Sequence, residues 1–150
     1  MKTLQLQKDF MTKIEKHQKA ICDISEVEVS KHVAIGDGFR IYLINVEDFY
    51  LDSAKMSNHK FCEIIRDTEK EEGYENAWLT NEMRVFQKEK LNKIENAETH
   101  AYVNEKFLKY FEDATFKIKH PHRPVLVYEN GVIRGLVLPM KFEEEGNVNK

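Results

Sequence analysis

The sequence contains few cysteines, few glycines and prolines, and no long run of apolar residues. Its two cysteines, Cys22 and Cys62, form no C-x-x-C pair, and this pattern favours free thiols in a reducing compartment over a disulfide framework. Residues 1–8 lack the apolar stretch of a secretory signal, and no segment reaches the roughly 20 apolar residues that span a bilayer. We therefore expect a cytoplasmic protein with no membrane partner.

The sequence also lacks a large excess of acidic or of basic residues. The net charge of −3 gives no global field that would attract nucleic acid, so any such contact needs a local basic patch. With 41% hydrophobic and 33% charged residues in a chain of 150, we expect a modest core under a strongly solvated surface. The length fits one domain, which we place at residues 1–142, followed by a mobile acidic tail at 143–150.

The first part of the chain shows one helical and two extended patterns. Leu6, Phe10, Ile14 and Ile21 recur at helical spacing and predict an amphipathic helix over 4–21, which packs on its own domain or on a partner helix. Alternating residues predict strands at 27–35 and 39–46. Gly36-Asp37-Gly38 between them tolerates positive φ, so we expect a hairpin turn there.

The middle of the chain is less regular. Ser57 or Asn58 is a suitable N-cap for a helix over 58–67, and the charged residues 68–76 predict an exposed loop. Residues 77–100 fit both a helical and an extended pattern, so their structure stays open at this point.

The last third of the chain predicts a helix followed by three strands. Asn104 is a suitable cap for a helix that continues through Asp113. Alternating and β-branched residues predict strands at 116–119, 125–128 and 132–140, and Asn130-Gly131 predicts a two-residue hairpin turn between the last two. The predicted fold class is α+β, an antiparallel sheet with helices packed on one side.

Three segments of this last third resemble the C-terminal end of bacterial sliding clamps, which are DNA polymerase processivity factors. They are residues 101–108 (AYVNEKFL), 124–127 (PVLV) and 136–142 (LVLPMKF). The resemblance implies a sliding-clamp-like fold and a peptide-docking groove bordered by the last strand. Val137, Pro139 and Met140 are then the partner-binding residues. The chain departs from the family in its single expected domain, its negative net charge and the acidic residues after Phe142.

A second candidate surface consists of cations in the same region. Lys117 and Lys119 alternate with apolar residues and so share one face of a strand, and Arg123 and Arg134 are near them in sequence. A basic sheet face of this kind can contact the phosphates of nucleic acid, although an ordinary solvated face has the same pattern. These four residues are the candidate nucleic-acid contacts.

Several clusters contain residue types used in catalysis or metal binding but lack the remaining parts of such sites. His120 and His122 are only two ligands, whereas a zinc site needs three or four. His59 and Cys62 have the spacing of one helical turn, and Cys62 is more typical of a small buried residue. The carboxylates of Glu47, Asp48 and Asp52 have no nearby oxyanion donors. Gly36-Asp37-Gly38 precedes a strand and not the helix of a phosphate-binding loop.

No catalytic, metal or cofactor site is therefore predicted, and the expected function is a non-catalytic binding module with a protein partner. The first hypothesis is a clamp-like accessory protein of DNA replication or of a mobile element, and under it self-association is an open alternative. The second is a small phage-type inhibitor that blocks a host enzyme such as a defence nuclease, with acidic residues 69–72 and 143–145 imitating nucleic acid. An enzyme is the third alternative.

Overall fold

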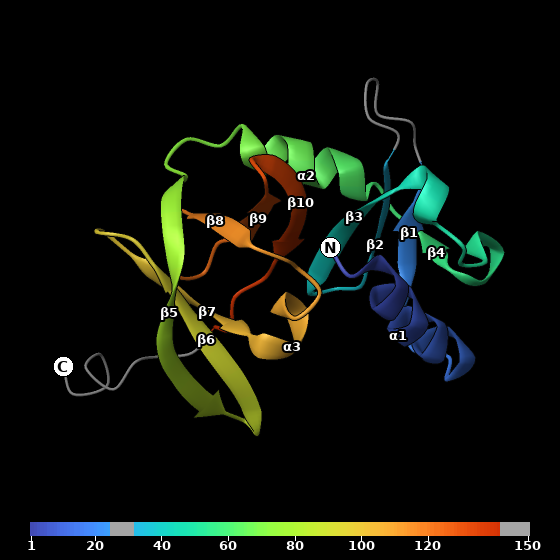
Figure 1. The fold of residues 1–150 in the computed structure, drawn as a ribbon, viewed down its shortest axis with the longest axis horizontal. Coiled ribbons are helices and arrows are strands. Elements are labelled where there is room, and N and C mark those ends of the chain that lie inside the picture. The colour runs from blue at the N-terminus through green and yellow to red at the C-terminus, as the bar shows by residue number, and fades with distance from the viewer. Residues whose placement is uncertain (25–31, 142–150) are drawn as a thin grey trace.

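The computed structural model describes residues 1–24 and 32–141, and within them a mixed sheet forms the centre of an α+β fold (Figure 1). The strands are β1 (Ile21–Asp23), β2 (His32–Gly36), β3 (Arg40–Asn45), β4 (Ser57–Asn58), β5 (Glu75–Phe86), β6 (Glu89–Glu95), β7 (His100–Asn104), β8 (Ala114–Ile118), β9 (Val125–Glu129) and β10 (Val132–Val137). Their order across the 10-stranded sheet is β4-β1-β2-β3-β10-β9-β8-β5-β6-β7. The β1–β4 pair is parallel and the other neighbouring pairs are antiparallel, as expected for most of the sheet.

Helices are few and short. They are α1 (Thr3–Glu15), α2 (Phe61–Glu69) and α3 (Glu105–Leu108), with one-turn 3-10 helices η1 (Val46–Asp48) and η2 (Ser53–Lys55). In the described part of the chain, none of these helices has the length and apolarity needed to cross a membrane. The expected acidic tail at 143–150 lies outside the described residues.

The helices pack on both faces of the sheet, so the prediction that they share one side is wrong. Successive strand residues point to opposite faces. In β2, Val33 therefore belongs to the core on the α1 side and Ala34 to the core on the α2 side. The α1-side core includes Phe10 and the flanking residues of α3, and the α2-side core includes Phe61 and Ile65. Both faces of the sheet are apolar at β2, so α1 covers one face and α2 covers the other.

The N-terminal helix is shorter than the predicted 4–21. It ends at Glu15, and His17 has a positive φ of 55°, which a helix cannot continue through. Ile21 has helical spacing from Phe10 but lies in β1, because pairing with β2 and β4 decides its conformation. Leu6 and Phe10 are fully buried, so α1 packs on its own domain and not on a partner helix.

The predicted hairpin at Gly36-Asp37-Gly38 is confirmed. β2 and β3 pair antiparallel, with Gly36 opposite Ile41. A Cβ atom on Gly36 would lie 2.1 Å from the carbonyl oxygen of Arg40, so only glycine fits this turn. Part of the predicted strand 27–35 lies outside the described residues.

The predicted cap of α2 is wrong. Ser57 and Asn58 form the short edge strand β4, and the helix begins at Phe61 with no side-chain cap from its own N-cap residue. Instead, the Oδ2 atom of Asp23 accepts the backbone N–H of Cys62 at 2.9 Å. This acceptor comes from β1, so local sequence could not reveal it. The expected loop 68–76 is shorter, because α2 extends to Glu69 and β5 starts at Glu75.

The open region 77–100 is extended. It consists of most of β5 and all of β6, which form a long hairpin. The turn between them places Gln87 and Lys88 at positive φ, 50° and 67°. Positive φ is usually supplied by Gly or Asn, so the sequence carries no turn signal at this point.

The C-terminal region keeps the predicted order of elements with different lengths. Asn104 caps α3 as predicted, its side chain accepting the N–H of Lys106 at 3.0 Å. The helix ends at Leu108, however, and not at Asp113, which has a positive φ of 47°. The Asn130-Gly131 turn is confirmed with both residues at positive φ, and β10 ends at Val137.

Strands β10, β9, β8, β5, β6 and β7 curl around the α1-side core, and the chain after β10 meets the other end of the curl. The N–H of Met140 donates to the carbonyl of Tyr102 in β7 at 2.8 Å. The N–H of Leu138 donates to the carbonyl of Phe39 at the start of β3, also at 2.8 Å. Residues 138–140 thus run between β3 and β7, and the candidate site lies along this segment.

Candidate functional site

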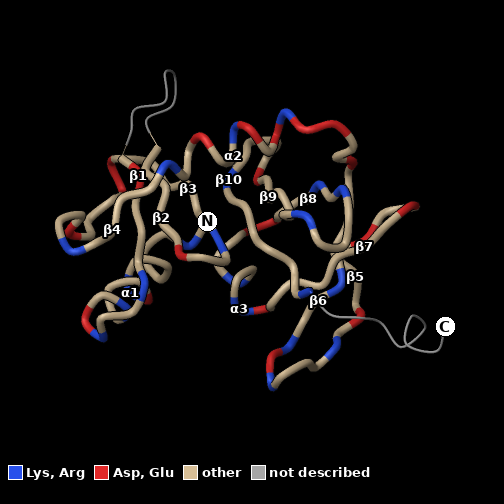
Figure 2. Tube along the Cα trace, turned by 180° about the vertical axis from the view of Figure 1, so that it is seen from behind, with Lys and Arg blue, Asp and Glu red and all other residues tan. Residues whose placement is uncertain are grey.

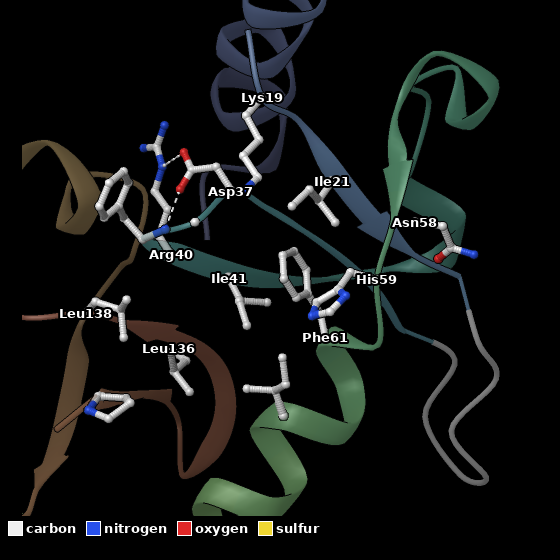
Figure 3. Close-up of a pocket in the computed structure, with 14 residues that line it drawn as sticks. Lys19, Ile21, Asp37, Arg40, Ile41, Asn58, His59, Phe61, Leu136 and Leu138 are labelled. Carbon is white, nitrogen blue, oxygen red and sulfur yellow. Dashed lines mark hydrogen bonds and ion pairs between the residues drawn. The ribbon is translucent and has the colours of Figure 1, made fainter.

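Two hollows lie next to each other, one on each side of Phe39. The first has a volume of about 370 Å³ and lies between the β2–β3 turn, the start of α2 and the end of β10 (Figure 3). Its apolar wall comes from Ile41, Phe61, Leu136 and Leu138. These side chains come from β3, α2, β10 and the segment after β10, so the hollow exists only when the sheet has assembled.

The second hollow has a volume of about 520 Å³ and lies between α3 and residues 138–141. Phe107, Pro139 and Met140 are among the residues that line it. Phe39 and Leu138 border both hollows, so we treat the two as one surface, the Phe39 groove. Phe39 divides this groove and remains 62% exposed, an unusual degree for a phenylalanine.

Hydrogen bonds fix the backbone of Phe39, whereas its side chain is mostly exposed to solvent. The Oδ1 atom of Asp37 accepts the N–H of Phe39 at 2.8 Å, and the carbonyl of Phe39 accepts the N–H of Leu138. The direction in which the ring projects is therefore set by the Gly-Asp-Gly turn and by the pairing with the segment after β10. A partner would meet a preformed aromatic ridge.

A buried ion pair supports this ridge from below. The Nε of Arg40 donates to Asp37 at 3.1 Å, and its guanidinium lies over the rings of Phe107 at 4.8 Å and Phe10 at 5.1 Å. Burial alone would lower the pKa of Arg40, but interaction with Tyr42 and Asp37 outweighs it and raises the pKa. The guanidinium therefore stays charged and acts as a structural cation.

The rim of the groove carries positive charge. Lys19 and His59 line the first hollow, and Lys141 lines the second. Within residues 1–24 and 32–141, neither lysine has an ion-pair partner, whereas Asp37 is occupied by Arg40 and by Lys13 at 3.3 Å. The groove is thus an apolar surface with cationic ends.

The structure separates the three predicted partner-binding residues. Pro139 and Met140 line the second hollow, so two of the three are placed at one surface. Val137 is fully buried in the α1-side core, opposite Arg40 and Val125 in the sheet, and its side chain does not reach the groove. Partner binding by Pro139 and Met140 stays a prediction.

Three of the four candidate nucleic-acid contacts interact with neighbouring side chains on the α2 side. Arg123 donates to Glu71 at 2.6 Å, and Lys119 lies 3.5 Å from the same carboxylate. The ammonium of Lys117 lies 5.2 Å from the ring centre of Tyr128. The Glu71 carboxylate offsets part of this positive charge, and its two cationic neighbours outweigh burial and lower its pKa.

The fourth residue, Arg134, belongs to the other face. It lies 3.3 Å from Glu129, whose carboxylate also accepts the N–H of Glu112 and lies 3.2 Å from the N-terminal amine beside α1. The four cations therefore do not form one basic surface. Figure 2 shows Lys and Arg interspersed with Asp and Glu along the described part of the chain.

In the described residues, side chains of the other candidate clusters make structural contacts. His122 donates its N–H to His120 in a tight turn, and the described residues contain no group of three or more His, Cys, Asp or Glu side chains that could hold a metal ion. His59 packs edge-on against Phe61 at 5.6 Å, while Cys62 is buried in the α2-side core. Asp52 caps η2 through the N–H of Ala54.

Sequence reasoning missed Phe39 as a candidate site residue. The available signal was a large aromatic residue directly after a Gly-Asp-Gly turn, at a position that a hairpin usually gives to a polar residue. The rest of the groove had no local signal, because it depends on β3 and β10 being neighbours in the sheet.

Comparisons of the chain with protein families, with curated proteins and with solved structures find no match. The chemistry of the groove is therefore inferred from its own side chains.

Proposed function

We propose that this chain is a non-catalytic binding module whose Phe39 groove receives a short apolar segment of a partner protein. The observation that carries this proposal is the exposed Phe39 ring on a fixed backbone between two apolar hollows. Binding would bury the ring and the walls on both sides of it. Interface centres built on aromatic anchors in apolar pockets supply most of the affinity of such complexes.

The charge of the rim indicates the chemistry of the partner segment. Lys19 and Lys141 favour acidic residues on either side of the apolar ones. A segment with two large apolar side chains, one for each hollow, and flanking Asp or Glu would match both features. Aromatic and branched aliphatic side chains fit hollows of about 370 and 520 Å³.

The wider role we propose is that of a clamp-like accessory protein in DNA replication or in a mobile element. Support comes from the resemblance of residues 101–108, 124–127 and 136–142 to sliding clamps. It also comes from the position of Pro139 and Met140 at an apolar hollow, where that resemblance expects a peptide groove.

The inhibitor hypothesis has no specific observation in its favour. Glu71 is engaged by Arg123 and Lys119, and Glu69 accepts the hydroxyl of Tyr128 at 2.9 Å, so this part of the acidic run is bound within the chain. The other acidic run, 143–145, lies outside the described residues.

Selection from a random peptide library on the immobilised chain tests the proposal. We expect enriched peptides to combine large apolar residues with Asp or Glu. Their binding should fall at least about tenfold with Phe39→Asp and with Met140→Ala, because each removes apolar contact area at the centre of the groove. Leu4→Ala is the matched control, since Leu4 is equally exposed but lies on α1, and it should leave binding unchanged.

Peptides that bind Phe39→Asp as well as the natural chain would overturn the groove as the binding site. The wider role needs a separate measurement, recovery of partners from a bacterial lysate with and without nuclease treatment. Recovery of replication proteins by the natural chain but not by Phe39→Asp would support the clamp-like role. Recovery of one unrelated enzyme in a nuclease-resistant complex would favour the inhibitor.

A further inference from the structure

Strand β5 has an open edge along most of its length. It pairs with β8 only at Glu75, Asn76 and Ala77, whereas it pairs with β6 as far as Phe86. Within the described residues, no strand is paired with the β8-facing edge of β5 beyond Ala77. The far ends of β5 and β6 extend beyond the rest of the molecule as an arm (Figure 1). Open edges of this kind are the usual sites at which strands from other chains add to a sheet.

The arm also exposes large apolar side chains. Leu79, Met83 and Val85 are all exposed, and Val85 is exposed to 69%. Their odd numbering, kept across the register shift between Leu79 and Met83, places them on one face of the strand. Trp78 is exposed on the opposite face. A strand that is apolar, exposed and unpaired on one edge is a candidate for association.

The charges of the arm are balanced. Residues 75–95 contain Glu75, Glu82, Glu89 and Glu95 against Arg84, Lys88, Lys90 and Lys93, so the formal charges cancel. Figure 2 shows the two signs interspersed along this hairpin. Two arms can therefore approach each other without net repulsion, although the whole chain has a net charge of −3.

The order of these charges is self-complementary. In a two-fold antiparallel pairing centred on Met83, Glu82 of each copy lies opposite Arg84 of the other. Registers centred on Glu82 or on Arg84 instead place like charges opposite each other, which is unfavourable. Of these three registers, the charges favour the one centred on Met83.

We propose that the β5 edge is a homodimer interface, in which two copies pair antiparallel about Met83 with reciprocal Glu82–Arg84 ion pairs. The interface is isologous, so it closes after two copies and does not form filaments. It lies apart from the Phe39 groove and does not depend on the function proposed for that groove.

Contacts within each chain shape this interface. Glu82 lies 3.2 Å from Lys93, and the guanidinium of Arg84 lies 5.4 Å from the ring centre of Tyr102. A carboxylate can accept from more than one cation, so Glu82 can keep Lys93 while it binds Arg84 of the second copy. The bulge between Leu79 and Met83 limits the length of regular pairing, so we expect a dimer that forms at high micromolar concentration.

Charge reversal combined with mixing tests the register. In the dimer, Glu82→Arg places two Arg–Arg pairs about the centre and Arg84→Glu places two Glu–Glu pairs there. Each variant alone should therefore lose the dimer, with at least about a tenfold rise in Kd. An equimolar mixture of the two variants restores both opposite-charge pairs and should recover the dimer. Analytical ultracentrifugation of the whole chain over a concentration series measures each case.

Recovery in the mixture also shows that both variants are folded. A natural chain that stays monomeric at the highest concentration would overturn the proposal, and so would a dimer that neither reversal weakens. Single variants that dissociate but do not recover when mixed would overturn the Met83-centred register, provided that their circular dichroism matches the natural chain.

Discussion

The two faces of the sheet are packed in different ways. On the α1 side, Tyr42 is surrounded by Phe10, Tyr110 and Phe111, with ring centres 6.5, 5.4 and 5.4 Å away, and the guanidinium of Arg40 is buried among them. On the α2 side the core consists of aliphatic residues, one cysteine and one phenylalanine: Ile21, Ala34, Ile41, Leu43, Phe61, Cys62, Ile65, Leu126 and Leu136. One face is an aromatic and polar network and the other is a plain apolar layer.

This difference shows how one face of a small sheet can be specified by directional contacts while the other face ends in an open hollow. Buried polar groups have to find their partners, so the Arg40–Asp37–Tyr42 network specifies one arrangement on the α1 side. The apolar α2 side makes no such directional demands, and its edge opens into the first hollow. Arg40 and Ile41 are adjacent on β3, and their side chains lie on the α1 side and the α2 side, respectively.

The largest expected effect comes from opening the α1-side core. Phe10→Ala should lower the free energy of unfolding by about 4 kcal/mol, because Phe10 is fully buried and also contacts Arg40. Phe61→Ala, the matched change on the α2 side, should lower it by about 3 kcal/mol, because Phe61 borders the first hollow and water can occupy part of the space. Urea denaturation compares the two. An equal or greater loss for Phe61→Ala would contradict the distinction between the faces.

The next effect tests the buried charge. Arg40→Met should lower the free energy of unfolding by about 3 kcal/mol, because it leaves the buried carboxylate of Asp37 with Lys13 as its remaining cation. Adding Asp37→Asn should recover part of this loss, since the unpaired charge is then removed. Ile41→Val, the neighbouring residue on the other face, should cost only about 1 kcal/mol. A double variant less stable than Arg40→Met would count against this explanation.

A smaller effect is expected where β1 supports α2. Asp23→Ala should lower the free energy of unfolding by about 1 kcal/mol, because the N–H of Cys62 loses its acceptor at the start of the helix. Asp52→Ala removes a similar cap from an exposed 3-10 helix and should cost less than about 0.5 kcal/mol. Thermal unfolding of both variants measures the contrast. Similar losses at the two positions would mean that Asp23 contributes no more than a surface cap.

The smallest expected effect is a loss of stability at low pH. Burial alone would raise the pKa of Asp9, but the Tyr110 hydroxyl and Lys109 outweigh it and lower the pKa. A carboxylate with a lowered folded pKa stabilises the fold above its unfolded pKa, near about 4, and this contribution disappears as pH falls through the folded pKa. Asp9 is partly exposed, so we expect less than about 1 kcal/mol.

Urea unfolding at about pH 6 and about pH 3 checks this prediction. The natural chain should lose more stability between the two values than Asp9→Asn does. An identical loss in both proteins would show that the Asp9–Tyr110 contact does not contribute to the acid dependence.

The parts of the fold that the sequence predicted correctly depend on local backbone chemistry. Gly36-Asp37-Gly38 and Asn130-Gly131 occur at the expected turns, and Asn104 caps the expected helix. The errors arise where distant pairing overrides local preference. Ile21 joins β1 despite its helical spacing, and Ser57 and Asn58 join β4 despite their suitability as caps.

The candidate site was predictable only in part. Resemblance pointed to Val137, Pro139 and Met140, of which Pro139 and Met140 line a hollow and Val137 is buried. Phe39 and Phe107 are far away in sequence, and only the sheet order brings them to the same groove. Hydrophobic periodicity describes which residues are buried within one element, but it does not state which elements become neighbours.

The pairing of β3 with β10 has a consequence for how the chain reaches its native state. Arg40 lies opposite Val137, roughly 100 residues later in the sequence. During synthesis the β2–β3 hairpin can form early. The free edge of β3, however, cannot pair until β10 has left the ribosome. Folding should therefore be slow for a chain of this size and wait for β10, which also builds the groove. A nascent chain would acquire the Phe39 groove late and all at once.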